Sequence, residues 1–199
     1  MAAGEPQAPI TGSRGDLQDL RLVTVTSRAE SGGRTQPAGA QWRYLAYDGD
    51  RVLAALGFGA AAWRLAVRER YIGWTDAERQ AHLREVVQNR RFMVLPWVAV
   101  RGLASALLGL AARRLPADWL ERAGYSPVLL ETFVECDRFA GTCLRAANWT
   151  RIGETVGRGK RDRIHNRPTT SFKLIWVHPL DPRFRELLCA PDHPAGGRS

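Results

Sequence analysis

An apolar stretch from residue 92 to residue 112 is the feature that most limits how this chain can fold. Its 21 residues match the length needed to cross a bilayer, about 20, but Pro96 and Arg101 interrupt it. The first half, Phe92–Val100, is nearly continuous in apolar residues, as in a strand buried on both faces. The second half has apolar residues at helical spacing: Leu103, Leu107, Leu108, Ala111 and Leu115. We therefore expect a central strand and then a helix that Pro116 ends, and no membrane span.

Two further segments carry specific local signals. Trp42–Tyr47 and Arg51–Phe58 flank the turn Asp48-Gly49-Asp50, which predicts a β-hairpin. Thr75 followed by Glu78 is a capping-box pattern, which predicts a helix over Asp76–Gln88.

The rest of the chain continues the alternation of strands and helices. Strands are expected at Leu20–Val25, Pro127–Glu135, Arg151–Thr155 and Phe172–His178, and Asp137 is expected to cap a helix with Ala140, Cys143, Leu144 and Ala147 on one face. This order predicts a mixed α/β (α+β) domain with one central sheet flanked by helices. Its 199 residues suit one main domain. We expect residues 1–37 to be a flexible lead, residues 38–188 the domain and residues 189–199 a tail.

Charge and cysteine usage limit the classes of partner and site. The chain has 29 Lys+Arg against 20 Asp+Glu, which gives a net charge of +9 and favours a polyanionic partner such as nucleic acid or a phosphate-bearing cofactor. Only two of the basic residues are lysines, so coding bias explains the excess equally well. Three cysteines without a paired motif and four histidines without ligand spacing predict no disulfide scaffold and no metal site. A reducing, cytoplasmic setting is the default expectation.

The junction of the central strand and its helix, Arg101–Leu108, is a candidate phosphate site. Small residues in the first turn of a helix let a phosphate approach the free backbone N–H groups, and the helix dipole favours the anion. Arg101 would add a charge-assisted contact. The alternative is that the alanines only allow the helix to pack closely on the sheet.

This junction resembles that of the GCN5-related N-acetyltransferases (GNAT), which have Arg-x-x-Gly-x-Gly/Ala there and grip the pyrophosphate of acyl-CoA. The resemblance implies binding of acetyl-CoA or another acyl-CoA by Arg101, Gly102, Ala104, Ser105 and Ala106. Ala104 replaces the first glycine of the family. The family also opens a V between two central strands, which the resemblance places near Pro96-Trp97.

A second set of sequence blocks is similar to the DruA family, which belongs to the Druantia anti-phage system and has relatives associated with transposases in mobile elements. The blocks are Gln41–Leu45, Leu56–Trp63, Arg70–Trp74, Asn89–Trp97, Leu129–Val134, Gly141–Trp149, Gly153–Thr155 and Gly157–Lys160. They cover about residues 38–188 and imply a role in defence or on a mobile element, with other defence proteins as partners. An N-terminal His-Tyr stretch of the family has no counterpart in this chain.

The resemblance also bears on proton transfer. GNAT enzymes protonate the leaving thiolate with a tyrosine that DruA relatives commonly share, and the matching position is Leu144. Glu131, inside the apolar run Val128–Val134, is the candidate general base because burial would raise the pKa of its carboxyl. The alternative for Glu131 is a buried ion pair with an arginine, whereas Glu135 marks the solvated end of the strand.

A basic segment near the C-terminus is a candidate nucleic-acid surface. It contains Arg151, Arg158, Lys160, Arg161, Arg163 and Arg167. Gly157 and Gly159 would let it follow a phosphate backbone, and the alternative is a solvated surface loop. Three hypotheses remain open: an acyltransferase, a non-catalytic module that binds DNA or RNA, and a truncated relic of the family.

Overall fold

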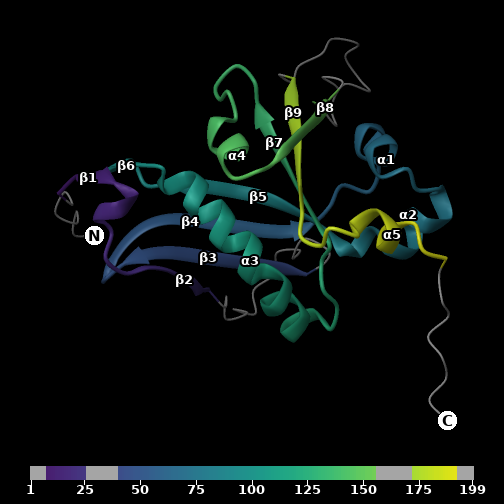
Figure 1. Cartoon of the computed structure of the whole chain (residues 1–199), viewed down its shortest axis with the longest axis horizontal. Coiled ribbons are helices and arrows are strands. Elements are labelled where there is room, and N and C mark those ends of the chain that lie inside the picture. The colour runs from purple at the N-terminus through teal and green to yellow at the C-terminus, as the bar shows by residue number, and fades with distance from the viewer. Residues whose placement is uncertain (1–7, 26–39, 156–171, 192–199) are drawn as a thin grey trace, which may run out of the picture.

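The computed structural model describes residues 8–25, 40–155 and 172–191. Its main feature is a seven-stranded mixed sheet with strand order β2-β3-β4-β5-β7-β9-β8, beside a small sheet of β1 and β6 (Figure 1). The strands are β1 Ile10–Ser13, β2 Leu20–Thr24, β3 Gln41–Asp48, β4 Arg51–Ala60, β5 Val86–Val94, β6 Val98–Arg101, β7 Leu129–Glu135, β8 Thr150–Glu154 and β9 Lys173–Pro179. The helices are α1 Ala66–Ile72, α2 Asp76–His82, α3 Leu103–Ala123, α4 Thr142–Ala146 and α5 Phe184–Leu188, with 3-10 turns at Arg14–Asp16 and Leu83–Glu85. The mixed α+β architecture predicted from the sequence is confirmed.

The first half of the sheet is antiparallel. The predicted hairpin is confirmed as β3 and β4, with Gly49 at a φ of 58° in the turn. β2 pairs with β3 along its whole length, and β1 and the 3-10 turn also fall within the first 25 residues. The strand expected at Leu20–Val25 is confirmed as β2, whereas residues 10–16, expected to be flexible, form β1 and the 3-10 turn, with Ile10 buried in the core.

The central strand begins and ends earlier than predicted. The capping box of Thr75 and Glu78 forms as expected, but α2 ends at His82, and Val86–Gln88, expected as helix, belong to β5. Val86 and Val87 are fully buried, and β-branched side chains suit a buried strand better than a helix. Pro96, which has no N–H for a ladder, lies in the turn after β5, so the expected strand Phe92–Val100 is two strands, β5 and β6.

The sheet divides into two arms at the centre of the molecule. β5 and β7 pair in parallel only where Val86–Asn89 of β5 lie beside Leu129–Thr132 of β7. Beyond these residues the two strands diverge (Figure 1). A bulge in β5 marks this point, where Phe58 faces Asn89 and Gly57 faces Arg91. The Thr132 hydroxyl donates a hydrogen bond of 3.0 Å to the Asn89 carbonyl there. The opening between central strands expected from the GNAT resemblance is present, but it begins at Asn89 and not at Pro96.

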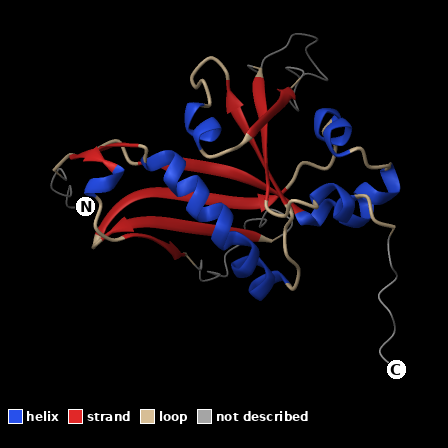
Figure 2. Ribbon diagram, viewed as in Figure 1, coloured by secondary structure: helices blue, strands red, loops and turns tan. Residues whose placement is uncertain are grey.

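The helices also differ from prediction at their ends (Figure 2). α3 does not stop at Pro116 but continues to Ala123, because Leu115 and Trp119 bury the same face in one core. α4 begins after Gly141 and not at Asp137. α5, near the C-terminal end of the domain, was not predicted.

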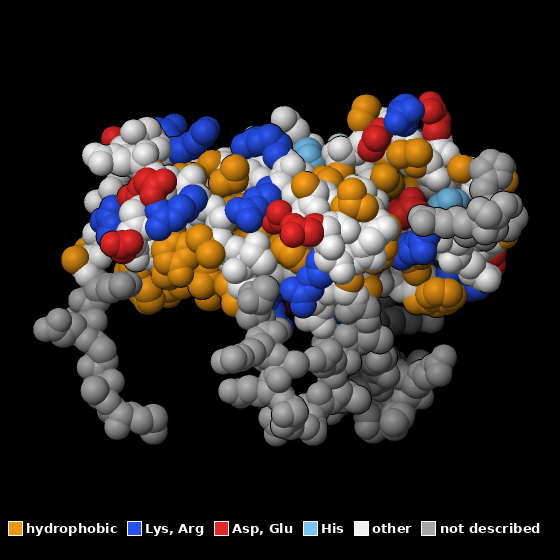
Figure 3. Space-filling view, turned by 90° about the horizontal axis from the view of Figure 1, so that it is seen from below, with side chains coloured by type: hydrophobic (Ala, Val, Ile, Leu, Met, Phe, Trp, Pro, Cys, Tyr) orange, Lys and Arg blue, Asp and Glu red, His pale blue; other side chains and the backbone are white. Residues whose placement is uncertain are grey.

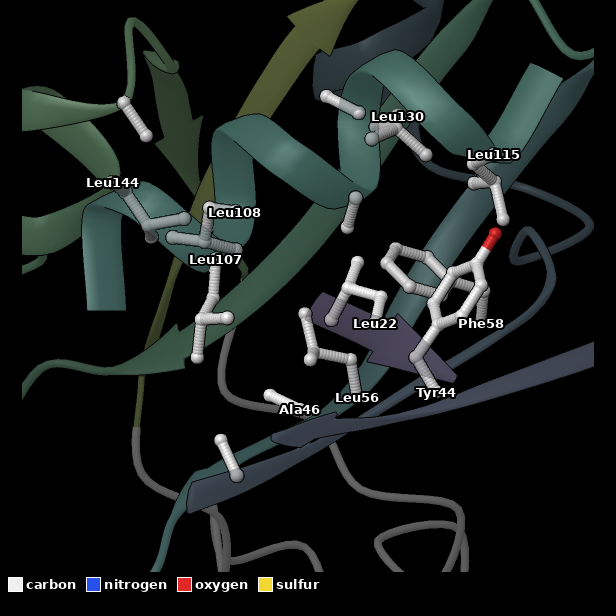
Figure 4. Close-up of a cluster of buried hydrophobic side chains, with 14 of the residues drawn as sticks. Leu22, Tyr44, Ala46, Leu56, Phe58, Leu107, Leu108, Leu115, Leu130 and Leu144 are labelled. Carbon is white, nitrogen blue, oxygen red and sulfur yellow. The ribbon is translucent and has the colours of Figure 1, made fainter. Parts of the chain in front are cut away.

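One core joins α3 to the inner face of the first arm and reaches α4. Leu22, Tyr44, Leu56 and Phe58 come from β2, β3 and β4, and Tyr44 donates a hydrogen bond of 2.7 Å to Asp118 of α3. Leu107 and Leu108 of α3 and Leu144 of α4 belong to the same cluster, and Figure 4 shows Leu108 and Leu144 close together. Apolar side chains therefore fill part of the region between α3 and α4. A second cluster, which includes Ile72, Trp74 and Phe184, packs at the other face of β7 and β9.

None of the helices in the described ranges is long and apolar enough to cross a membrane.

Candidate anion-binding site

A groove runs along α3. Its cavity volume is about 440 Å³, and a second hollow of about 450 Å³ shares Arg14, Ala106 and Arg113 with it. The first is lined by Arg14, Ser105, Ala106, Gly109, Ala112, Arg113, Pro116, Ala146, Ala147, Asn148, His178, Pro179 and Leu180. The lining has two arginines and no carboxylate, so the groove suits an anion.

Small residues on α3 form one wall of this groove. Ser105, Ala106, Gly109 and Ala112 recur at the helical spacing of one face. A Cβ atom on Gly109 would lie 3.5 Å from Nη1 of Arg113, so the guanidinium of Arg113 lies over the turn before its own. α3 therefore presents a cationic group above a wall of short side chains.

Arg14 reaches the same groove from the N-terminal segment. β1 pairs in parallel with β6, which places Ser13 opposite Arg101. Arg14 directly follows Ser13. A Cβ atom added to Gly102 would lie 4.0 Å from the Cβ atom of Arg14. Neither Arg14 nor Arg113 has a side-chain ion pair or hydrogen bond within residues 8–25, 40–155 and 172–191. Sequence reasoning missed both residues. The pattern Ser13-x-x-Asp16, which forms a capping box, was the available signal for order near Arg14.

The residues predicted to bind a phosphate divide into two groups. Gly102 begins α3 at a φ of 79°, and its carbonyl accepts hydrogen bonds from the N–H of Ala106 (3.1 Å) and the hydroxyl of Ser105 (3.0 Å). Ser105 and Ala106 line the groove with Arg14, whereas Arg101, Gly102 and Ala104 do not. The N–H groups of Leu103, Ala104 and Ser105 lie in the first turn, where α-helices leave donors unpaired.

His178 lies at the α4 end of the groove. Its Nδ1 is 3.2 Å from the carbonyl oxygen of Asn148, and its ring stacks on Trp149 with the centroids 5.6 Å apart. Asn148 has a φ of 61°. A carbonyl only accepts, so the neutral ring carries its proton on Nδ1 and has its lone pair on Nε2.

The proposed general base, Glu131, does not reach the groove. Its Oε2 is 3.0 Å from Nη1 of Arg68, its Oε1 accepts from the N–H of Ala62 (3.2 Å), and both charged side chains are 0% exposed. Burial raises the pKa of the Glu131 carboxyl, and the charge and hydrogen bond of Arg68 oppose this shift. The buried ion pair is the alternative that the structure supports, and the assignment of Glu131 as a base in contact with substrate is wrong.

The position of the expected tyrosine is also buried. Leu144 is 4% exposed and packs in the core with Leu107 and Leu108. Burial raises the pKa of the neighbouring Cys143 thiol. Neither side chain provides an acid at the groove surface.

Of the basic segment predicted to bind nucleic acid, the structure describes only Arg151. Its guanidinium forms an ion pair with Glu154. Arg158, Lys160, Arg161, Arg163 and Arg167 lie outside the described residues. Within the described ranges, no three His, Cys, Asp or Glu side chains cluster as metal ligands.

Comparison with known proteins gives one family match. The family model described as "Druantia protein DruA" matches residues 16–174. No curated protein sequence matches the chain.

Similar solved structures include several acetyltransferases. The ribosomal-protein-S18-alanine N-acetyltransferase from Escherichia coli aligns with a TM-score of 0.47 and 11% identity over 82% of this chain and 95% of that one. A variant of the spermidine N-acetyltransferase from Vibrio cholerae aligns with a TM-score of 0.45 and 11% identity, over 72% of this chain and 66% of that one. An aminoglycoside acetyltransferase in complex with coenzyme A has a TM-score of 0.42 and 13% identity, over 74% and 69% of the two chains.

Proposed function

Because this chain belongs to the DruA family, we propose that it serves an anti-phage defence or mobile-element locus and that its α3 groove binds a carrier of the acyl-CoA class. The observation that carries the proposal is the pair Arg14 and Arg113. Two cations from different elements line one groove without a carboxylate, and neither has an ion pair elsewhere in the described ranges. Both arginines are exposed to solvent and neither pairs with a described carboxylate, so their charges are available to the oxygens of a bound phosphate.

The groove fits the phosphate groups of such a carrier. Arg14 and Arg113 would contact phosphate oxygens. Ser105, Ala106 and Gly109 leave room for an extended chain along the helix. From Ser105 to Pro116 the helix rises by about 16 Å, and His178 lines the same groove.

An acyl-CoA supplies an activated thioester when it is bound. In this chain, the Nε2 atom of His178 is the proton acceptor that lines the groove, because its Nδ1 is engaged by Asn148. Glu131 is buried against Arg68, and Leu144 cannot donate a proton. The proposed domain therefore positions the carrier and accepts a proton, and does not assist departure of the thiolate.

Thermal unfolding with and without coenzyme A tests the proposal. A ligand at about 100-fold excess over its Kd adds about 2.7 kcal/mol of stability, which raises the midpoint by several degrees. Pantetheine, which lacks the phosphates, should produce no shift if the arginines supply the affinity. The shift with coenzyme A should disappear in Arg14→Gln/Arg113→Gln.

The matched control is Arg70→Gln/Arg183→Gln, which removes two exposed arginines that lie on neither wall of the groove. This variant should keep the full shift. Equal shifts with pantetheine and coenzyme A, or loss of the shift in the control variant, would contradict the proposed site.

A further inference from the structure

One face of the first arm of the sheet is not covered by a helix of the described chain. α3 packs on the inner face of β2–β5, while α1, α2 and α5 lie at the other end of the molecule (Figure 2). On the outer face, four apolar residues are in register across the four strands: Val23, Leu45, Ala55 and Met93. Val23 is 41% exposed and Met93 53%. Figure 3 shows exposed apolar side chains gathered at this end of the molecule, with both basic and acidic side chains beside them.

Two arginines border the next row of this face. The register places Arg43 and Arg91 opposite Gly57 on its two sides. Their Cα atoms are separated by two strand spacings, about 10 Å. Both side chains are exposed, and neither forms an ion pair or hydrogen bond with any described residue. Gly57 has no side chain, so the floor between them is flat.

Two more guanidinium groups lie against this part of the sheet. Arg21 lies over the ring of Tyr47, 5.6 Å from its centroid. The side chain of Arg90 covers Gly59: a Cβ atom added to Gly59 would lie 2.9 Å from Nε of Arg90. The Arg90 guanidinium also donates a hydrogen bond of 2.8 Å to the Ala60 carbonyl. Planar guanidinium groups held against a surface can stack on flat rings as well as attract anions.

The charge on these strands is mainly positive. Together β2–β5 contain five arginines and a single acid, Asp48, which pairs with Arg51. Asp19, just before β2, pairs with Arg21. The outer face therefore combines an apolar row, an aromatic ring and unpaired cations.

We propose that the outer face of β2–β5 binds single-stranded nucleic acid. Arg43 and Arg91 would contact successive phosphates, because guanidinium groups match phosphate geometry. The apolar row and Tyr47 would contact unstacked bases. A duplex keeps its bases in the stack and away from these side chains. A single strand carries a phosphate and a flat base at every nucleotide, which an acidic polypeptide does not, so single strands fit the combination best.

Fluorescence anisotropy with a labelled oligothymidylate of about 20 nucleotides tests this surface on the full chain. Titrations run between about 50 and 200 mM NaCl, where phosphate contacts lose strength steeply. Arg43→Gln/Arg91→Gln should weaken binding at least about tenfold at the lower salt and reduce the salt slope by about 1.4, the value for two lost contacts to a single strand. Arg70→Gln/Arg145→Gln removes the same charge from exposed sites elsewhere and should change the affinity by less than about twofold.

Three results would overturn the proposal: equal losses in the two double variants, tighter binding of a duplex of the same sequence, or loss of binding only when the basic residues of 158–167 are replaced. The thermal midpoint shows that each variant is folded. The coenzyme A shift should persist in Arg43→Gln/Arg91→Gln, so failure of this surface and failure of the α3 groove are distinguishable.

Discussion

Nη1 of Arg68 lies 3.0 Å from Oε2 of Glu131, and neither side chain is exposed to solvent. The Arg68 guanidinium also donates to the Ala62 carbonyl (2.9 Å), while the Ala62 N–H donates to Glu131. These hydrogen bonds join α1 and the segment before it to β7. The buried carboxylate is thus a structural group.

Neutralising this carboxylate should strongly destabilise the fold. Glu131→Gln leaves the Arg68 charge buried without a partner, and such losses lower the free energy of unfolding by about 3–5 kcal/mol. Urea unfolding measures the effect. Glu135→Gln, on the same strand but paired at a partly exposed site with Arg138 and Lys173, is the control and should cost less than about 1 kcal/mol. Similar costs for the two variants would show that the buried pair contributes no more than a surface pair.

Restoring the tyrosine of the family pattern should not restore an acid. In Leu144→Tyr the larger ring enters the core beside Leu107 and Leu108, and overpacking of this kind costs about 1–3 kcal/mol. Leu144→Met keeps the volume and should cost less than about 1.5 kcal/mol. Thermal unfolding compares the two, and a Leu144→Tyr variant as stable as the wild type would show that space exists beside α4.

Gly141 should tolerate no side chain. It precedes α4 with a φ of 68°, and a Cβ atom would lie 2.6 Å from Cζ2 of Trp176. Gly141→Ala therefore carries both the left-handed penalty, about 1–2 kcal/mol, and a clash with a buried ring. Gly49 has a similar φ of 58°, but no atom lies within 4 Å of an added Cβ, so Gly49→Ala measures the left-handed penalty without the clash. Chemical denaturation should show a clearly larger loss for Gly141→Ala, and equal losses would mean that the indole moves aside freely.

Asp48 should make stability depend on acid pH. Hydrogen bonds to its carboxylate, first of all from the N–H of Asp19 and also from Arg51 and the N–H of Gln18, hold its pKa below the ordinary value near 3.8, against opposing desolvation. The folded pKa is the lower one, so the contribution is complete above the unfolded pKa and is lost as the pH falls through the folded pKa.

Asp48→Asn should lower the free energy of unfolding by about 1–3 kcal/mol at neutral pH, and the difference from the wild type should shrink below about pH 4. Unfolding curves from neutral pH to pH 3 measure this, with Asp50→Asn in the same turn as control. A difference that stays constant with pH would contradict the assignment.

Local signals predicted the fold well wherever one short pattern decides the structure. The hairpin around Gly49, the cap at Thr75 and the apolar strand β7 all follow from neighbouring residues. Pro116 did not end α3, because burial of Trp119 beyond it outweighs the loss of one backbone hydrogen bond. The pairing of β6 with β1 depends on contacts across the chain, which periodicity does not contain.

The site was predictable only in part, for the same reason. Ser105 and Ala106 line the groove as the helix pattern suggested. Arg113 lies on the solvent side of an apolar helix, where its sequence neighbours give no sign of a ligand. Whether Glu131 was a base or an ion pair depended on Arg68, which is 63 positions away.

The small sheet of β1 and β6 has a kinetic consequence. Arg14 is held by a four-residue strand that pairs with one partner only, so its detachment leaves the seven-stranded sheet intact. Local opening of such a unit requires less free energy than global unfolding. Amide protons of β1 should therefore exchange with solvent sooner than those of β4 or β7, and each opening would withdraw one cation from the groove while the rest of the protein stays folded.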